Sequence, residues 1–383
     1  MDAIWDAVSG PLLYGFAFLA VLTIVVFFHE LGHFLVARWC GVKVSAFSIG
    51  FGPEVGGFYD RHGTRWKLSW IPLGGYVKFM DDDNAASAPS RETIATMSPE
   101  ERAGSFHSKP VWQRAAVVVA GPVANFILAI VIFTLWFWSY GVYSTEARVD
   151  EVIPESPAAR AGLKAGDVVT SIAGRPVTIF EEIQRVVGTN VGQTLTFEIL
   201  RDGQKLEIPV TPEVREQLDD KGDKIQMVMI GVRRIPGQEG LKLHQPGLVE
   251  SVGLAGDRTW FIVTSTLGYF GDVIGGRQSA DQLGGPIRIA DVAGRVATQG
   301  LEYIIQLAAF LSVSVGLINL FPIPLLDGGH LMFYAIEAIR GRPLNERHQE
   351  IGFRIGMALV LSLMIFATFN DLHILRRWLG GAG

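Results

Sequence analysis

Four long runs of the sequence contain no aspartate, glutamate, lysine or arginine, and they limit the possible folds more than any other feature. The runs are Leu12–Phe28, Ala115–Ser144, Tyr303–Leu326 and Ile355–Asn370. A helix needs about 20 mostly apolar residues to cross the hydrocarbon core of a bilayer, and fewer if charged residues at its ends snorkel. The sequence therefore predicts a multi-pass α-helical membrane protein with four transmembrane helices.

Composition and the shorter segments exclude several classes of protein. A fifth apolar run, Thr259–Gly271, is short enough to lie at the membrane interface rather than to span it. With a net charge of −5, the chain lacks the excess of lysine and arginine that proteins use to bind nucleic-acid phosphates. We therefore expect no nucleic-acid partner. Cys40 is the only cysteine, which excludes an intrachain disulfide and a cysteine zinc cluster. The first residues carry no positive charge and no small-residue cleavage site, so we expect the first run to be a retained span.

Lysine and arginine residues crowd two of the loops between the apolar runs. They gather between the first and second runs, for example at Arg65 and Arg114, and between the third and fourth, for example at Arg340 and Arg354. The positive-inside rule places such loops in the cytoplasm. The long segment between the second and third runs is then expected to face outward.

The outward segment has the pattern of a folded domain. A helical stretch is expected around Phe180–Val187, and two alternating runs then flank Asp202 and Gly203, a pair typical of a β-hairpin turn. In the first cytoplasmic loop, GFGP (50–53) and WKLSWIPLGGYVKF (66–79) are alternating apolar stretches punctuated by glycine. We expect these to form short β-strands near or in the interface, followed by a solvated linker at 80–93.

The stretch FFHELGHFLV (27–36) places three ionisable groups in or beside the first apolar run. On a helix His29 and His33 project from one face, so both imidazoles can reach one ion, while Glu30 can touch a ligand of that ion without binding it. The H-E-x-x-H spacing is typical of zinc peptidases. Ionisable groups inside a span cost about 2.5–3.5 kcal/mol each, so a functional role is expected.

A catalytic zinc ion takes three protein ligands and keeps one position for water, so a third ligand must lie elsewhere. Asp327 and His330, in NLFPIPLLDGGHL (319–331), are the two candidates. With four spans, the first and third runs have the same direction and end at the same leaflet. Pro322 and Pro324 interrupt the helix before Asp327, and irregular backbone at membrane depth is tolerated where it is buried in protein or lines a wet cavity.

These motifs resemble the site-2 protease family of zinc intramembrane proteases, and more closely its bacterial branch, the regulator-of-sigma-E protease type. The second motif of that family, N-x-x-P-x-P-x-x-D-G, has its counterpart in Asn319, Pro322, Pro324, Asp327 and Gly328. The resemblance implies that Zn²⁺ is held by His29, His33 and Asp327, with Glu30 as the catalytic base. It also implies that Asn319, Pro322 and Pro324 lie at the substrate, with Asn319 binding its backbone or stabilising the oxyanion.

Other stretches are similar to the same branch, among them AGPVANF (120–126) and GGPIRIA (284–290). In that branch, strands that follow the first helix form a membrane-re-entrant hairpin that pairs with an extended substrate. The resemblance implies that the hairpin residues at the substrate are Gly74, Gly75, Tyr76 and Val77.

The outer segment is similar to a circularly permuted bacterial PDZ domain, with IPESPAARAGLKAGDVVTSIAG (153–174) as its core. The best-known members of the branch carry two PDZ domains in tandem, whereas this chain has room for one. The expected parts are the first transmembrane helix (1–42), a cytoplasmic loop with re-entrant strands (43–110), the second transmembrane helix (111–144), the periplasmic PDZ domain (146–235), a linker with an amphipathic or interfacial helix (236–300), the third transmembrane helix (301–328), a cytoplasmic loop (329–352) and the fourth transmembrane helix (353–373).

The resemblance implies a zinc endopeptidase of the bacterial inner membrane, with its active site near the cytoplasmic side. It would cleave transmembrane segments of single-pass membrane proteins, such as anti-sigma factors already cut once, in regulated intramembrane proteolysis. The PDZ domain would bind a substrate carboxyl terminus or exclude substrates with bulky outer domains. Two alternatives are a PDZ-bearing membrane scaffold with a structural metal and a zincin that cleaves soluble peptides at the membrane surface.

Overall fold

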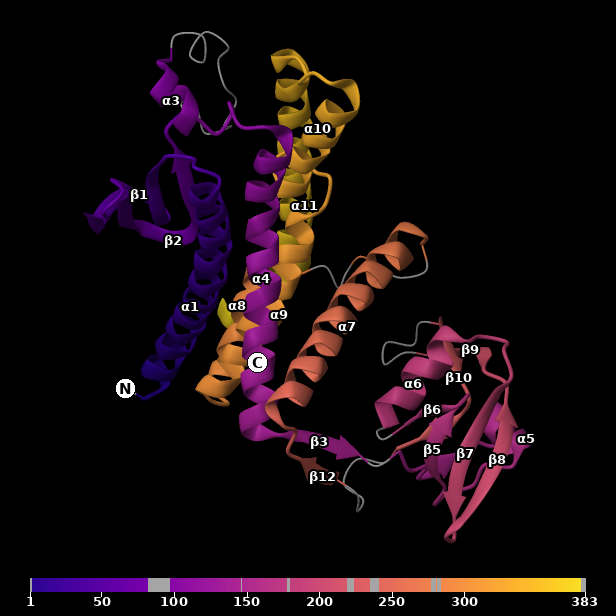
Figure 1. Ribbon diagram of the computed structural model, residues 1–383. Helices are drawn as coiled ribbons and strands as arrows, with labels where there is room; N and C mark the ends of the chain where they lie inside the picture. Colours follow the sequence, from indigo (N-terminus) through magenta and orange to yellow (C-terminus); the bar gives the residue numbers. More distant parts are fainter. Residues whose placement is uncertain are drawn as a thin grey trace. The chain divides into compact units, whose positions relative to one another are not determined.

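The structure, a computed structural model, describes residues 2–81, 97–145, 147–177, 180–218, 224–234, 241–276, 280 and 284–379. They form two compact units, one made of Met1–Trp136 with Leu248–Gly383 and the other of Phe137–Gly247 (Figure 1). Apart from Met80 and Asp81, the linker predicted at 80–93 lies outside the described residues.

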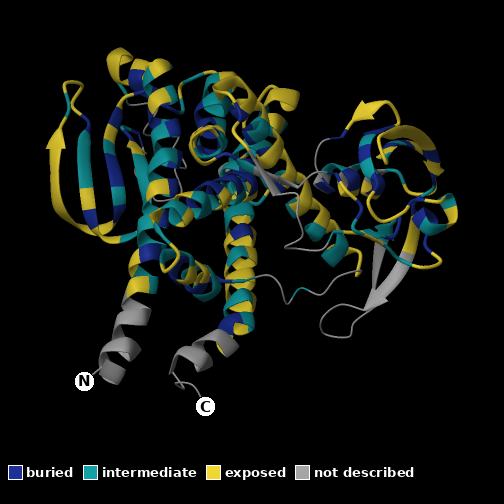
Figure 2. Ribbon diagram, turned by 90° about the horizontal axis from the view of Figure 1, so that it is seen from below, coloured by how far each residue is buried: buried dark blue, intermediate teal, exposed yellow. Residues whose placement is uncertain are grey.

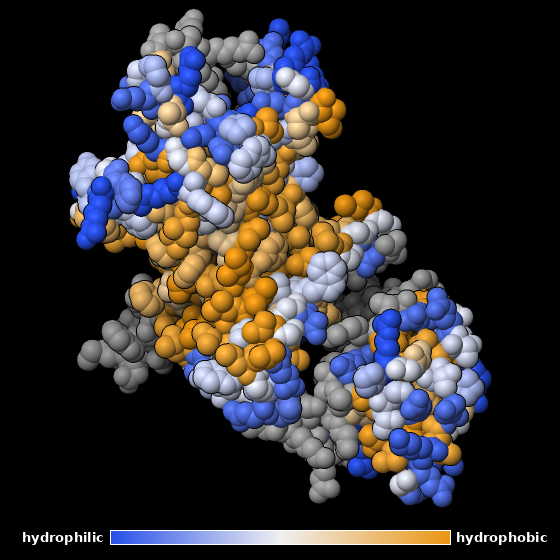
Figure 3. Space-filling model, viewed as in Figure 1, coloured by the Kyte–Doolittle hydropathy of each residue, from blue (hydrophilic) through white to orange (hydrophobic). Residues whose placement is uncertain are grey.

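Helices make up most of the first unit. They are α1 (Asp2–Trp39), α3 (Pro99–Gly104), α4 (Val111–Tyr140), α7 (Leu248–Ile274), α8 (Pro286–Ala297), α9 (Leu301–Asn319), α10 (Asp327–Arg340) and α11 (Glu346–Leu379). Among the described residues, four segments are long and apolar enough to cross a membrane, namely Leu13–Trp39, Val111–Tyr140, Leu301–Asn319 and Arg347–Leu372. Figure 3 shows a belt of hydrophobic side chains across this unit, with hydrophilic side chains on either side of it. The unit thus has the four apolar helices expected of a membrane protein.

The third apolar run of the sequence is divided in the structure. α9 ends at Asn319, and α10 begins at Asp327 after an irregular segment that contains Pro322 and Pro324. Proline cannot donate to the helix ladder and clashes with the preceding turn, so the helix stops before this segment. α10 then occupies much of the loop expected at 329–352, because apolar residues recur there at helical spacing. It ends at Gly341, whose φ of +70° closes the helix in a left-handed conformation.

The strands β1 (Val44–Tyr59) and β2 (Arg65–Phe79) follow α1 and pair antiparallel with several register shifts. Phe47 of β1 lies opposite both Trp66 and Val77, so the first part of β1 is flanked by two arms of β2. The second part of β1, from Phe51 onward, is exposed (Figure 2). Among the described residues the second arm of β2, 75–79, pairs with β1 alone, so it forms an edge of the sheet.

Two buried clusters hold α1 in place. Val21 and Val25 of α1 pack with Ala308 of α9. Nearer the end of α1, Phe34 packs in a second cluster that includes residues of the hairpin, of the loop before α4 and of α4 itself, among them Phe47, Phe79, Phe106 and Val117. The H-E-x-x-H segment lies between these two clusters.

The second unit is built on an antiparallel sheet in the order β6 (Arg175–Pro176), β5 (Val168–Ile172), β7 (Leu195–Arg201) and β8 (Gln204–Val210). Asp202 and Gly203, both with positive φ, join β7 to β8, which confirms the predicted hairpin. α6 (Phe180–Thr189) confirms the predicted helical stretch and packs in one core with the sheet and α5 (Pro157–Ala161). Three small pairs complete the unit: β3 (Val142–Thr145) with β12 (Leu241–His244), β4 (Glu151–Val152) with β11 (Val232–Arg233), and β9 (Glu213–Leu218) with β10 (Lys224–Met229).

Candidate metal centre

Three side chains with metal-binding atoms meet where α1 faces the start of α10. His29 and His33 lie one turn apart on α1, and Asp327 is the first residue of α10. Their ligand atoms all lie within 4.8 Å of one another. Asp327 Oδ2 is 3.1 Å from His29 Nε2 and 3.6 Å from His33 Nε2. The two sequence motifs, almost 300 residues apart, therefore meet at one point.

The donor set at this point fits zinc. Two imidazoles and one carboxylate leave a fourth position open, which is the ligand arrangement of catalytic zinc sites. The two Nε2 atoms are 3.2 Å apart, and the buried Asp327 Oδ2 has no hydrogen-bond partner among the described residues. A buried carboxylate oxygen without a partner is costly. A cation shared by the three atoms would remove that cost.

α4 contacts the Nδ1 atom of each imidazole ring. His33 Nδ1 lies 2.8 Å from the carbonyl oxygen of Val117, so it donates its proton there and Nε2 remains free to bind a metal. His29 Nδ1 lies 3.3 Å from the side-chain amide of Asn125, which is fully buried. The structure places Asn125 Nδ2 toward the ring and leaves Oδ1 without a partner among the described residues. Exchanging the two amide atoms would let Oδ1 accept the Nδ1 proton and leave Nε2 of His29 free in the same way.

Gly121 of α4 makes room for the two rings. A methyl group at this position would lie 2.3 Å from His33 Nε2 and 2.9 Å from His29 Cε1. Atoms at those distances overlap, so any side chain at position 121 would push the imidazoles away from the ligand position. The glycine is therefore required by the close approach of α4 to the metal ligands.

The irregular segment between α9 and α10 brings Asp327 to the histidines. Its bend is closed by backbone hydrogen bonds, including Leu326 N to Ile323 O at 2.9 Å, and Leu325 has a φ of +122°, which is strained for a leucine. Asn319, the last residue of α9, places its Nδ2 3.3 Å from His29 Nε2. Pro322 is exposed and Pro324 is half-buried, so neither prolyl ring is enclosed in the core.

Glu30 lies beside the ligands in a cavity of about 130 Å³. The cavity is lined by Glu30, His33, Val77, Phe79, Phe106, Val117, Val118, Asp327, His330 and Tyr334. His330, the other candidate for the third ligand, therefore lies near the centre, but it is Asp327 that groups with the two imidazoles. Glu30 is outside that group and has space beside it for a small molecule such as water.

The hairpin residues singled out in the sequence lie on the edge arm of β2. Val77 lines the cavity and its backbone amide bonds to Glu30. Tyr76 instead stacks on Phe51 of β1, with ring centroids 6.1 Å apart. Gly74 also lies against the Phe51 ring, and Gly75 packs between β1 and Glu30. The edge arm thus reaches Glu30 and the cavity beside it through Gly75 and Val77.

Three contributors on α4 were not assigned a role from the sequence, namely Val117, Gly121 and Asn125. Gly121 and Asn125 do leave a signal in the sequence, because a Gly-Pro pair and an asparagine interrupt an otherwise apolar run at 115–144. Val117 contributes through its backbone carbonyl, and such a contact leaves no trace in the residue type.

Comparison with known proteins agrees with this geometry. The family model described as peptidase family M50 matches residues 17–363, which contain His29, Glu30, His33 and Asp327. A protein of Agrobacterium fabrum, Atu1380, whose name presents it as a candidate zinc metalloprotease, is 49% identical over 98% of this chain and 100% of its own length. Protease RseP of Yersinia pestis is 32% identical over 93% of this chain and 97% of that protein.

The chain is also similar to solved structures of PDZ domains. The crystal structure of the PDZ domain of an SdrC-like protein from Listeria monocytogenes is 24% identical, covers 24% of this chain and 87% of that one, and has a TM-score of 0.19. The family match and the two relatives, in contrast, extend over nearly the whole chain. The chain therefore belongs to peptidase family M50, a family of zinc metalloproteases.

Proposed function

We propose that this zinc metalloprotease is an intramembrane endopeptidase that cleaves the transmembrane segments of single-pass membrane proteins. One observation carries the proposal, namely that the ligand set meets on helices of the apolar belt. His29 and His33 belong to the candidate span Leu13–Trp39, and Asp327 follows the candidate span Leu301–Asn319. A protease site within such helices favours a substrate that lies in the membrane itself.

The side chains have distinct roles in the proposed reaction. His29, His33 and Asp327 hold Zn²⁺, which when bound supplies Lewis-acid chemistry to water and to the scissile carbonyl. Glu30 accepts the proton of the attacking water at its carboxylate and later passes it to the nitrogen of the leaving amine. Asn319 donates from Nδ2 to a substrate carbonyl, either along the backbone or where the oxyanion develops.

The edge arm of β2 provides a place for the substrate backbone. A transmembrane helix hides its carbonyls in internal hydrogen bonds, so it must unwind locally before a protease can attack it. Adding the unwound stretch as a strand beside Gly74, Gly75, Tyr76 and Val77 would satisfy its freed backbone groups. The irregular segment with Pro322 and Pro324 would line the other side of the path.

The proposal includes the orientation of the chain in a bacterial inner membrane. The basic loops favour a cytoplasmic position for the hairpin side of the first unit and a periplasmic position for the second unit. In that position, a second unit acting as a PDZ domain would bind the carboxyl terminus left by an earlier cut or exclude substrates with bulky outer domains. Anti-sigma factors trimmed outside the membrane are substrates of the expected kind.

Replacing Glu30 with glutamine tests the central role. We expect Glu30→Gln to lower the rate of cleavage of a bilayer-embedded single-pass substrate by about 10²-fold or more, because the proton acceptor is lost. Zinc content should stay that of the wild type, because Glu30 is outside the ligand group. Glu302→Gln, at a half-buried position in the first turn of α9, is the matched control and should keep full activity.

Full activity of the Glu30→Gln variant would refute the general-base role. If the wild type keeps its zinc but cleaves no substrate, that result would instead favour a scaffold with a structural metal. Turnover of a soluble unfolded protein that persists after lipid and detergent are removed would favour a zincin acting on soluble peptides.

A further inference from the structure

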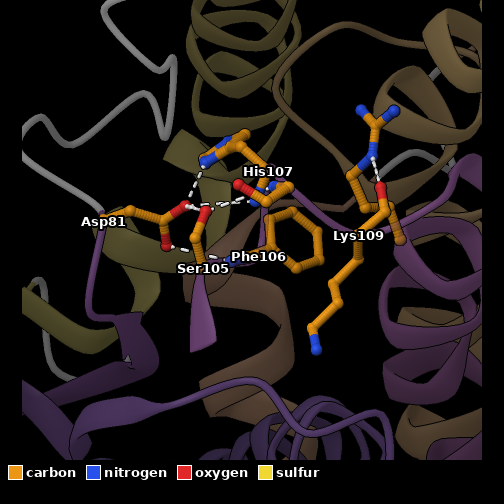
Figure 4. A network of polar contacts seen from close by, with 7 residues as sticks. Asp81, Ser105, Phe106, His107 and Lys109 are labelled. Carbon is orange, nitrogen blue, oxygen red and sulfur yellow. Dashed lines mark hydrogen bonds and ion pairs between the residues drawn. The ribbon is translucent and has the colours of Figure 1, made fainter. Parts of the chain in front are cut away.

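A second polar cluster lies outside the metal centre, where the end of β2 meets the loop between α3 and α4 (Figure 4). Asp81 accepts four hydrogen bonds from three consecutive residues. Its Oδ2 accepts from Ser105 Oγ at 2.6 Å, from His107 N at 3.1 Å and from His107 Nδ1 at 2.9 Å, and its Oδ1 accepts from Phe106 N at 3.2 Å. We name Asp81 with residues 105–107 the Asp81 clasp.

The Asp81 clasp is buried and charged. The side chain of Asp81 is 1% exposed and that of His107 is 7% exposed. Burial raises the pKa of the Asp81 carboxyl, but the hydrogen bonds from His107 and Ser105 outweigh it and hold the pKa well below its usual range. The carboxylate is therefore ionised at neutral pH, and hydrogen bonds to a charged acceptor are the stronger kind.

The clasp fixes the position of Phe106. The ring of Phe106 stacks on Phe79 of β2, with centroids 4.6 Å apart and an interplanar angle of 15°. Both rings are buried, and both line the cavity that contains Glu30, His33 and Asp327. Backbone bonds from Met80 N to Lys43 O and from Lys43 N to Gly104 O fasten the same region. The clasp therefore builds one wall of the catalytic cavity.

Another part of the cavity lining is fastened in a similar way. Arg114, near the start of α4, pairs with Glu337 of α10 at 2.6 Å and lies over the Tyr334 ring at 4.9 Å from its centroid. Tyr334 lines the same cavity. Neither Asp81 nor Arg114 lines the cavity, so both act on it through the aromatic side chains that they hold.

We infer that this cavity receives an apolar substrate side chain next to the scissile bond, and that the Asp81 clasp sets its size by holding Phe106 against Phe79. The inference rests on the proposed function and adds a determinant of sequence preference to it. Four residues contribute polar groups to the lining, namely Glu30, His33, Asp327 and His330. The other lining residues, which contribute mainly apolar surface, are Val77, Phe79, Phe106, Val117, Val118 and Tyr334.

The size of the cavity limits which side chains fit. Its volume of about 130 Å³ is slightly below that of an engineered apolar cavity of about 150 Å³ that holds one benzene molecule. A leucine side chain is of a suitable size, whereas an indole ring is too large. Removing the Phe106 ring would extend the apolar end of the cavity and admit larger side chains.

The test compares substrates that differ only beside the scissile bond. Mass spectrometry of wild-type products first locates the bond cleaved in a bilayer-embedded single-pass substrate. Substrates with Ala, Leu, Phe or Trp on each side of that bond are then compared by kcat/KM and by equilibrium binding to the Glu30→Gln protein. On one side of the cleaved bond, the wild type should have a higher kcat/KM for the substrate with Leu than for the substrate with Trp. Phe106→Ala should reduce this ratio about tenfold or more.

Two further variants separate positioning from stability. Asp81→Asn should shift the preference in the same direction as Phe106→Ala, because an amide cannot accept all four hydrogen bonds. Asp60→Asn is the matched control: Asp60 accepts from His62 N, Thr64 N and Trp66 Nε1 at the turn between β1 and β2, outside the cavity lining. It should leave the preference unchanged. Phe106→Leu, with a smaller expected shift, repeats the test should Phe106→Ala fail to fold.

Equal preferences in the wild type and the Phe106 variants, in both measurements, would overturn the inference. A uniform loss of kcat/KM for all four substrates in Asp81→Asn would overturn the role of the clasp, because a merely structural residue affects every substrate alike. Absence of cleavage by the wild type would count against the proposed function alone. In that case, binding to the Glu30→Gln protein of substrates varied at each position of the transmembrane segment in turn would still decide whether Phe106 selects the side chain.

Discussion

His29 and His33 each direct Nδ1 toward α4 and Nε2 toward Asp327. This division of the two ring nitrogens decides which atom can bind a metal, because a nitrogen that carries a proton cannot be a ligand. The carbonyl of Val117 and the amide of Asn125 therefore contribute as much to the centre as the ligands' own positions on α1. The residues that orient the two rings thus determine metal binding as much as the residues that would touch the ion.

Asn125→Leu tests this contribution. The variant keeps a side chain of similar size but removes the partner of His29 Nδ1, so the ring loses its fixed orientation. We expect zinc affinity to fall about 10–100-fold, as is usual when such an outer partner of a metal-binding histidine is lost. Competition with a chelator of known affinity measures the change.

Thr134→Val is the control, at a buried position of α4 where the hydroxyl has no hydrogen-bond partner among the described residues. Equal zinc affinity of Asn125→Leu and wild type would contradict the orienting role.

At the scale of helices and strands, the sequence predicts some features of the site and misses others for identifiable reasons. Helical spacing predicts that His29 and His33 share a face, and the common direction of two spans predicts that Asp327 lies near them. The positive-inside rule places the segment 329–352 between two spans but does not predict that α10 fills much of it, because loop charge carries no information on helical spacing. The edge arm of β2 depends on register shifts with β1, and alternation of residues does not encode such shifts.

α11 holds the irregular segment that carries Asp327, and this packing can be tested. A methyl group at Gly356 would lie 1.5 Å from the carbonyl oxygen of Pro324, so Gly356→Ala must displace the segment and with it Asp327. We expect kcat/KM to fall about 10²-fold, the effect that a misplacement of about 1 Å can have at a catalytic site. Gly268→Ala on α7, where nothing lies within 4 Å of the added methyl group, should be neutral or slightly stabilising. Similar activity of the two variants would contradict the proposed packing.

At the scale of the whole molecule, we expect the two units to depend on zinc to different extents. In the first unit the candidate metal ligands come from α1 and α10 and are supported by α4, so one ion would link elements that are far apart in the chain. The second unit has its own core, formed by residues such as Val169, Ile183 and Phe197. Binding to the folded state stabilises the elements that form the site, and local opening elsewhere is governed by local packing.

Removing zinc from the full-length protein should therefore loosen the first unit alone. Hydrogen exchange followed by mass spectrometry measures this, with and without a chelator. We expect faster exchange in the middle of α1, in the part of α4 near Val117 and Asn125, and at the start of α10, and a return to the original rates when zinc is added back. Exchange in β5, β7 and β8 should stay the same, because their hydrogen bonds depend on the core of the second unit. An equal rise in both units, or no rise around His29 and His33, would show that no ion links α1 to α10.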